Sequence, residues 1–233
     1  MTPTTIPPAD FVAIPPLLIA TGNPHKVEEI GAVLGELGIA CEGFASLGSS
    51  YPEPEENGAT FVENARLKAL GYARESGRVC LADDSGLEID ALDGRPGVHS
   101  ARYAADRFPP DADRAARDSA NNARVLEELD DVTAVGRVAR FVCVLCIASP
   151  DGRVLAEVRG TFEGRIGSPE PDGVPRGSNG FGYDPLFLVG PDCGSTSAEL
   201  APEEKNRISH RGQALVLLAE KIRDGALNVL RGV

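Results

Sequence analysis

Two segments rich in Asp and Glu offer the hard oxygen ligands that a divalent cation prefers. Asp83-Asp84-Ser85-Gly86 follows a short apolar run, and Glu55-Glu56-Asn57-Gly58 lies in a stretch rich in Pro and Glu. Ligands of α/β proteins bind beyond the carboxyl ends of strands, and Mg²⁺ binds one or two carboxylates together with substrate phosphates. Adjacent side chains on a strand point apart, so only one of the two aspartates need face such a ligand. The alternatives are a turn with capping carboxylates and a solvated acidic loop.

A second candidate site is the segment Thr21-Gly22-Asn23-Pro24-His25-Lys26, between an apolar run and a pattern of helical spacing. Backbone N–H groups at a helix N-terminus bind anions, and Lys26 adds a full positive charge. The spacing of a Walker A loop is absent. The segment therefore predicts an anion site, and the alternative is a plain strand-to-helix turn with a surface lysine.

Two further motifs have side chains suited to a nucleoside. Phe181-Gly182-Tyr183-Asp184 places aromatic residues beside glycines, and such aromatics can stack on a base or pack in the core. Ser209-His210-Arg211 precedes the last helical pattern and could read a base edge or an anion. Its alternative is a capping serine followed by two exposed polar residues.

The elements expected to position these residues alternate between strands and helices. We expect strands at 17–20, 39–44, 79–82, 87–92, 138–148, 153–158 and 186–189. We expect helices from Val27 to Gly38, from a capping box at Thr60–Glu63 to Gly77, over 111–129, and from Ser209 to Leu230. The strand at 79–82 is expected to end at Asp83, and a turn at 149–152 makes 138–158 a hairpin. Strands mixed with helices and including a hairpin predict an α/β fold with a mixed sheet.

Composition limits the partners and the setting of the protein. The 233 residues are 42% hydrophobic and 25% charged, and the net charge is −12. This acidity disfavours a nucleic-acid polymer, whose binding depends on Lys and Arg, and leaves small nucleotides open. The longest apolar run, 141–148, is too short to cross a bilayer, so no membrane partner is expected.

The ends of the chain and its cysteines also carry an expectation. Residues 1–16 are rich in Pro and lack the Lys or Arg of a leader segment, so we interpret them as a disordered extension before one domain at 17–233.

The cysteine count is five, and Cys80, Cys143 and Cys146 lie in strand-like contexts. This usage indicates reduced thiols and a cytoplasmic protein. On a strand, Cys143 and Cys146 would point to opposite faces and could not share a metal.

Together these segments resemble one family. The motifs occur in a fixed order: Thr21-Gly22-Asn23-Pro24-His25-Lys26, Thr60-Phe61-Val62-Glu63-Asn64-Ala65, Ala82-Asp83-Asp84-Ser85-Gly86-Leu87, Pro96-Gly97-Val98-His99-Ser100-Ala101-Arg102-Tyr103, Phe181-Gly182-Tyr183-Asp184-Pro185 and Ser209-His210-Arg211-Gly212-Gln213-Ala214. This order is similar to that of the inosine triphosphate pyrophosphatase family, also called dITP/XTP pyrophosphatases. The likeness spans about Leu17 to Leu230.

The resemblance implies a fold, a reaction and an assembly. It implies an elongated mixed central sheet flanked by helices, with two lobes and a cleft between them, and a homodimer. It implies hydrolysis of ITP, dITP and XTP to the monophosphate and pyrophosphate with Mg²⁺, which removes deaminated purine nucleotides from the nucleotide pool.

The resemblance also implies roles for single residues. Asp84 would be the general base and a Mg²⁺ ligand, and Glu55 would be the other metal ligand, with Glu56 close enough to leave the register open. The remaining residues would bind substrate: the triphosphate at Thr21, Gly22, Asn23, Pro24, His25 and Lys26, and the rest of the nucleotide at Ser85, Phe181, Gly182, Tyr183, Asp184, Lys205, His210 and Arg211.

Three readings of the site remain open from the sequence. A donor near O6 of the base, from Arg211, His210 or a backbone N–H, would favour keto purines over adenine. A related pyrophosphatase acting on modified pyrimidine nucleotides is the nearest alternative enzyme. A nucleotide sensor without turnover is the alternative from another class, but such a module would not need the carboxylates.

Overall fold

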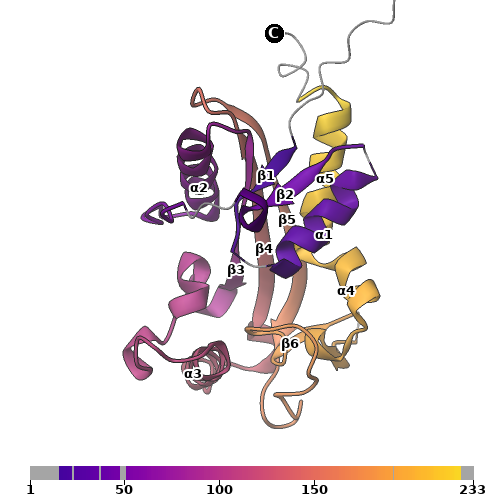
Figure 1. Cartoon of the computed structure of the whole chain (residues 1–233). Helices are drawn as coiled ribbons and strands as arrows, with labels where there is room; N and C mark the ends of the chain where they lie inside the picture. The colour runs from indigo at the N-terminus through magenta and orange to yellow at the C-terminus, as the bar shows by residue number, and fades with distance from the viewer. Residues whose placement is uncertain (1–15, 23, 37, 48–50, 191, 227–233) are drawn as a thin grey trace, which may run out of the picture.

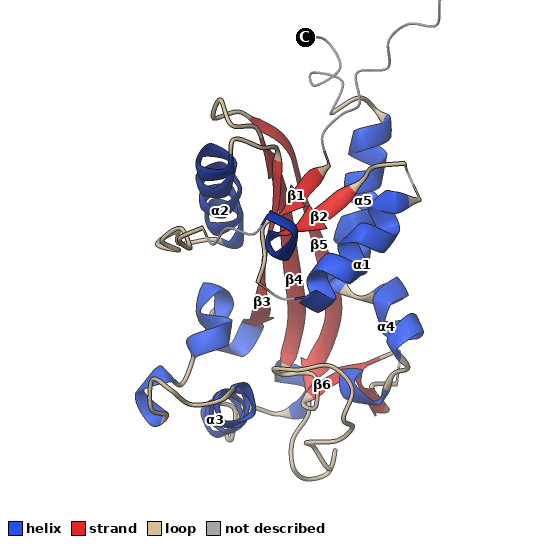
Figure 2. Ribbon diagram, viewed as in Figure 1, coloured by secondary structure: helices blue, strands red, loops and turns tan. Residues whose placement is uncertain are grey.

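Seven strands form one mixed sheet in the computed structural model, which describes residues 16–22, 24–36, 38–47, 51–190 and 192–226 (Figure 2). The strand order is β2-β1-β3-β4-β5-β6-β7. β1 is parallel to β2 and β3, and the other neighbours are antiparallel. The strands are β1 (Leu17–Ile19), β2 (Cys41–Gly43), β3 (Cys80–Ile89), β4 (Val138–Ala148), β5 (Val154–Ile166), β6 (Phe187–Val189) and β7 (Ser195–Thr196). The predicted α/β fold with a mixed sheet is confirmed.

Within the described residues, five α-helices accompany the sheet: α1 (Pro24–Gly35), α2 (Phe61–Ser76), α3 (Arg114–Glu128), α4 (Pro202–Ile208) and α5 (His210–Arg223). The sequence pattern predicts all of them except α4, a seven-residue helix, and it also misses the two-residue strand β7. The last helix ends at Arg223, short of the predicted Leu230, and residues 224–226 form a turn. The extension at 1–15 and Leu37, at the end of the first predicted helix, lie outside the described residues. No helix of the described residues is long and apolar enough to cross a membrane.

The expectation that a strand ends at Asp83 is wrong. β3 continues without a break to Ile89, and each of its residues pairs with one of β4, from Cys80 opposite Ala148 to Ile89 opposite Ala139. This continuous antiparallel ladder with the long apolar strand β4 outweighs the turn preference of an Asp-Asp-Ser-Gly segment. Asp83 and Asp84 therefore lie in mid-strand and project to opposite faces of the sheet.

Helices cover both faces of the long strands. α2 lies on one face, while α1 and α5 lie on the other (Figure 1). The alternation of β4 separates the two layers, because Val144 and Cys146 pack in the cluster with α2 whereas Cys143 and Leu145 pack with α1 and α5. This arrangement confirms that Cys143 and Cys146 point apart, and all five cysteines are free.

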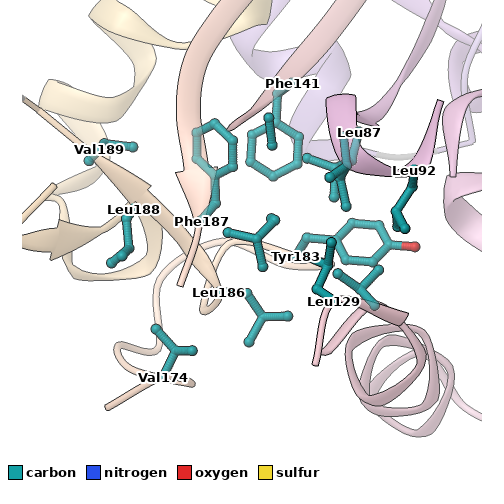
Figure 3. Packing of buried hydrophobic residues seen from close by; sticks show 14 of the residues in the cluster. Leu87, Leu92, Leu129, Phe141, Val174, Tyr183, Leu186, Phe187, Leu188 and Val189 are labelled. Atoms are coloured by element: carbon teal, nitrogen blue, oxygen red, sulfur yellow. The ribbon is translucent and has the colours of Figure 1, made fainter. Parts of the chain in front are cut away.

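A third hydrophobic cluster forms the other end of the molecule. It gathers residues of β6, α3 and the far ends of β3, β4 and β5, with the rings of Phe141 and Phe187 4.5 Å apart at their centroids (Figure 3). The long β4–β5 hairpin spans both ends, since β5 is 13 residues long instead of the six expected. The sheet thus links two lobes, each with its own core, as the resemblance implies.

The capping box at the start of α2 is a testable source of stability. The Thr60 hydroxyl accepts from the Glu63 N–H at 3.2 Å, and the Glu63 carboxylate accepts from the Thr60 N–H at 3.1 Å. We expect Thr60→Ala to lower the free energy of unfolding by about 0.5–2 kcal/mol, measured by urea denaturation. Thr133 begins a short 3₁₀ turn with no side-chain cap, so Thr133→Ala is the matched control. Equal losses in the two variants would contradict the role of the cap.

Candidate functional site

The candidate site lies at the edge of β3 that β1 leaves open. β1 pairs with β3 only at Cys80 and Leu81, and β3 continues for eight further residues. The chain leaving β1 passes this edge and enters α1 at Pro24. The segment 95–100 covers this edge from Leu87 onward, so the open stretch is 82–85, where side chains from both faces of β3 can flank one ligand. The structure thus brings the 21–26 segment and the two aspartates into one region.

Asp83 contacts every other side chain of a first group, which consists of Lys26, Ser85 and Arg211. Its carboxylate lies 2.5 Å from Lys26 Nζ and 2.9 Å from Arg211 Nε, and it accepts from the Ser85 hydroxyl at 2.7 Å. Burial alone would raise the pKa of Asp83, but the charges of Lys26 and Arg211 outweigh it and hold the pKa well below its usual range. The ionised Asp83 therefore connects three residues predicted to bind substrate, which lie on α1, β3 and α5.

Asp84 forms a second group on the opposite face of β3. Lys68 Nζ donates to Asp84 Oδ1 at 2.7 Å and lies 3.4 Å from Glu56 Oε1. Burial raises the pKa of Asp84 in spite of Lys68, and Glu56 adds to the shift. For Lys68, burial would lower the pKa, but the charge of Asp84 raises it above the ordinary value. Asp84 Oδ2 is buried and has no hydrogen-bond partner among the described residues.

The structure distinguishes the two candidate carboxylates of the acidic loop. Glu55 is exposed, whereas Glu56 is half-buried and reaches Lys68 beside Asp84. The geometry therefore favours Glu56 over the predicted Glu55 as the carboxylate that acts with Asp84. No cluster of three or more His, Cys, Asp or Glu side chains arranged for a metal is found within the described ranges.

Sequence reasoning missed Lys68 and left Asp83 without a role. A signal for Lys68 was present, because Asn64 and Lys68 are four residues apart on the face of α2 that buries Phe61, Ala65 and Tyr72. A lysine or an asparagine on a buried apolar face needs a polar partner. For Asp83 the pattern gave no such signal, since its partners Lys26 and Arg211 are distant in sequence.

Asp184 organises a third group around the 180–184 loop. It accepts from the Phe181 N–H at 2.8 Å, from Lys205 Nζ at 2.5 Å and from the Ser197 hydroxyl at 2.8 Å. Gly180 has a φ of +82°, and a Cβ there would lie 2.1 Å from Asp184 Oδ2. Only glycine fits this position. Asp184 and Lys205 thus brace the loop that presents Phe181.

The two aromatic residues of this loop have different environments. Phe181 is 47% exposed, and the guanidinium of Arg114 lies 4.1 Å from its ring centroid. Tyr183 is buried in the hydrophobic cluster, and its hydroxyl donates to the Ser100 carbonyl at 2.8 Å (Figure 3). Gly182, between them, donates its N–H to Asp118 at 2.9 Å. The ring of Phe181 is therefore available to a ligand, while the ring of Tyr183 packs in the core.

α5 presents His210 and Arg211 from its first turn. The Ser209 hydroxyl caps the helix by accepting from the Gly212 N–H at 3.1 Å, as the alternative interpretation of this motif expects, but His210 and Arg211 are not exposed. The helix sits directly on β5, where a Cβ on Gly160 would lie 2.2 Å from the His210 carbonyl oxygen. The His210 ring stacks on Phe141 with centroids 5.2 Å apart. Burial, and then the charge of Arg211, lower the pKa of His210 to about 3, so this imidazole is neutral at physiological pH.

The depressed pKa of His210 predicts a loss of stability in mild acid. Above pH ~6.5, the ordinary pKa of a histidine, His210 is neutral in both the folded and the unfolded chain. Below it the unfolded chain binds a proton that the folded protein does not, until the pH approaches the folded value of about 3. Between pH 7 and pH 5.5 we expect His210 to reduce the free energy of unfolding by about 1 kcal/mol. Urea denaturation at both pH values should show a smaller reduction in His210→Gln; an equal reduction would contradict the shift.

The remaining predicted residues lie at the exit of β1. Thr21 is half-buried and Gly22 is exposed, and Pro24 and His25 are the first two residues of α1. Asn23 lies outside the described residues. The anion role of this segment stays a prediction, supported by its position before a helix N-terminus.

Comparison with known proteins gives a consistent result. A model of the Ham1 family matches residues 17–221. The chain is 51% identical over 199 residues to a dITP/XTP pyrophosphatase of Exiguobacterium sibiricum, covering 85% of this chain and 92% of that one. It is 46% identical to a dITP/XTP pyrophosphatase of Pseudomonas aeruginosa, covering 91% and 99%. The solved structure of a HAM1 protein from Coxiella burnetii superposes with a TM-score of 0.76 at 40% identity, covering 90% of this chain and 98% of that one.

Proposed function

Since the chain belongs to the Ham1 family, we propose that it is a nucleoside triphosphate pyrophosphatase. Its substrates would be dITP, ITP and XTP, and its products the monophosphate and pyrophosphate. The proposal rests on the environment of Asp84, a buried carboxylate. Its Oδ1 accepts a hydrogen bond from Lys68, and its Oδ2 has no hydrogen-bond partner within the described residues. A buried acceptor without a partner is rare in proteins and points to a water or ligand in the working enzyme.

Asp84 has the properties of a general base. In the reaction a water attacks the α-phosphorus, and the bond from the α-phosphorus to the bridging oxygen breaks, with its electron pair leaving on pyrophosphate. Asp84 Oδ2 would take the proton of the water, while Lys68 holds Oδ1 and fixes the direction of the carboxylate. A pKa raised by burial makes this carboxylate a stronger base than an exposed aspartate.

The carboxylates of this group also fit Mg²⁺. Asp84 Oδ2 is a buried oxygen without a partner among the described residues, and Glu56 supplies a second carboxylate near it through their shared contact with Lys68. These hard ligands suit Mg²⁺, which keeps several waters and binds substrate phosphates as well. We propose that Glu56 and Asp84 hold the ion, in place of the predicted Glu55. When bound, the ion would supply positive charge against the triphosphate.

The other two groups would bind the ends of the nucleotide. Lys26 and the N-terminus of α1 would hold phosphate oxygens, and the exposed ring of Phe181 would stack on the base. The neutral imidazole of His210 and the guanidinium of Arg211 lie together on the first turn of α5. A donor from this turn to O6 would favour hypoxanthine and xanthine, because adenine carries an amino group there and would leave the donor unpaired.

Further parts of the proposal rest on the resemblance, which implies a homodimer, and on the cysteine usage and the Pro-rich composition of the first 16 residues. We propose that the protein is a homodimer in the cytoplasm, and that residues 1–16 lie outside the catalytic domain at 17–233.

Pyrophosphate release from the purified full chain tests the proposed function. We expect rapid release from ITP and XTP with Mg²⁺, little from ATP, GTP or dTTP, and none after the metal is removed with EDTA. Release from modified pyrimidine nucleotides instead would favour the related pyrimidine enzyme. ITP binding without release from any nucleotide would indicate a sensor and contradict the proposal.

A further inference from the structure

Asn64 is a buried amide that the proposed reaction does not yet use. Its side chain is 0% exposed, and Oδ1 accepts from the Gly58 N–H at 2.9 Å. That backbone donor fixes the orientation of the amide, because the NH₂ group cannot accept a hydrogen bond. Nδ2 must then face the other way, where it has no partner among the described residues. An unsatisfied buried donor costs about 1–3 kcal/mol, so this amide needs an acceptor that the protein alone does not provide.

Asn64 lies on the same buried face of α2 as Lys68, the residue that contacts Asp84. α2 runs alongside β3 in the opposite direction. Phe61 lies against Gly86, where an added Cβ would be 2.8 Å from its ring, and Lys68 contacts Asp84. Asn64 is between these two contacts, on the same buried face of α2 and one turn before Lys68. It therefore faces the stretch of β3 from Asp84 to Gly86.

Asn64 and Asp84 have complementary unpaired groups. Asn64 Nδ2 is a donor without an acceptor, and Asp84 Oδ2 is an acceptor without a donor, within the same part of the described structure. A water molecule can satisfy both, since it accepts one hydrogen bond and donates another. Its second lone pair stays free to attack phosphorus.

We propose that the Asn64 amide N–H donates to the attacking water and holds it next to Asp84. Asn64 Oδ1 also fixes the loop of Glu56, because it accepts from the Gly58 N–H. This inference rests on the proposed function. In the reaction the water oxygen, still held by Asn64, forms its bond to the α-phosphorus. One water proton passes to Asp84 Oδ2, and pyrophosphate leaves with the electron pair of the broken bond. Asn64 itself gains and loses no proton.

Asn64→Asp tests this inference, because it keeps the acceptor for Gly58 and replaces the donor by an oxygen. We expect kcat for ITP to fall by about 10²- to 10³-fold, the range for losing one hydrogen-bond donor to a reacting group. The affinity for a non-hydrolysable α,β-methylene analogue of ITP, measured by calorimetry, should change by less than about threefold. Thermal stability without ligand should fall, because the new carboxylate is fully buried, so kcat is compared with the affinity for the analogue rather than with Tm.

Asn121 is the matched control, a buried asparagine that is 2% exposed. Its Oδ1 also accepts from a backbone N–H, that of Ala104 at 2.7 Å, but its Nδ2 donates to the Ser100 and Ala101 carbonyls at 3.3 and 3.4 Å. Asn121→Asp loses these internal bonds, so we expect a lower Tm with an unchanged kcat for the folded protein. Both variants should thus lower Tm, and only Asn64→Asp should lower kcat.

The outcomes separate the inference from the proposed function. Absence of pyrophosphate release by the wild-type protein contradicts the proposed function itself. An active wild-type protein with an unchanged kcat in Asn64→Asp overturns the role of Asn64. A lower affinity for the analogue with an unchanged kcat would assign the donor to a substrate phosphate oxygen and overturn the water. If Asn64→Asp does not fold, the neutral variant Asn64→Ser should show the same loss of kcat, and wild-type turnover in it would overturn the inference.

Discussion

Asp84→Asn is expected to lower kcat for ITP by about 10²- to 10⁴-fold, the range for removing a general base, while ITP still binds. Asparagine has the size of aspartate, but its amide cannot take a proton from the attacking water. Lys68 would keep the carboxylate of Glu56 as a neighbour at 3.4 Å, so the buried lysine is not left without a negative charge. Pyrophosphate release and calorimetric binding of the α,β-methylene analogue would measure the two effects separately.

The control for Asp84→Asn is a carboxylate far from the site. Asp151 lies in the turn of the β4–β5 hairpin, where Arg153 Nε approaches it at 2.7 Å. Asp151→Asn makes the same chemical change and should retain wild-type kcat and KM. Full turnover in Asp84→Asn would remove Asp84 as the base, and loss of analogue binding together with kcat would indicate a disrupted site instead.

The contrast between β4 and β3 shows how far the sequence determines the fold. β4 matches its predicted range of 138–148, because a long apolar run followed by a Ser-Pro-Asp-Gly turn strongly favours a strand. The local sequence of β3 instead predicts that the strand ends at Asp83, because Asp, Ser and Gly favour turns. Its continuation depends on pairing with β4, about 60 residues later in the chain, and a local pattern cannot show that pairing.

In the candidate site, too, local motifs predict some residues, whereas distant contacts determine their partners. The motifs predict roles for Asp84, Lys26 and Arg211 because their residue types and their order carry the resemblance. The partners of these residues depend on distant contacts: Asp83 joins Lys26 to Arg211, and Lys68 joins Asp84 to Glu56. The register of the acidic loop could not be decided between Glu55 and Glu56 from sequence, because it depends on which carboxylate reaches Lys68 from across the fold.

Asp83→Leu is expected to have the largest effect on stability in the molecule. The substitution removes the carboxylate that Lys26 and Arg211 share, in a site where the Asp83 side chain is only 2% exposed. Breaking a buried ion pair by removing one partner costs about 3–5 kcal/mol, because the remaining charge stays desolvated. Urea denaturation should show a loss of this size in the free energy of unfolding.

Burial, rather than the ion-pair distance, should decide the size of that loss. Arg66 and Glu157 also approach to 2.5 Å, but their side chains are 50% and 24% exposed. Water and salt screen such a pair, so Glu157→Leu should destabilise the protein much less than Asp83→Leu. Equal losses in the two variants would show that Asp83 is no more important than a surface partner.

A double variant separates the charge of Asp83 from the packing around it. Lys26→Met removes one of the two cations that Asp83 neutralises and keeps much of the volume of the lysine stem. In the background of Asp83→Asn, Lys26→Met should therefore restore part of the lost stability. In the wild-type protein it should destabilise, because it removes one of the two positive charges that pair with Asp83. Activity should not return with stability, because Lys26 is also proposed to hold the triphosphate. Additive effects on stability would instead mean that Lys26 and Asp83 do not interact. Asp83 would then not position Lys26 or the first turn of α1.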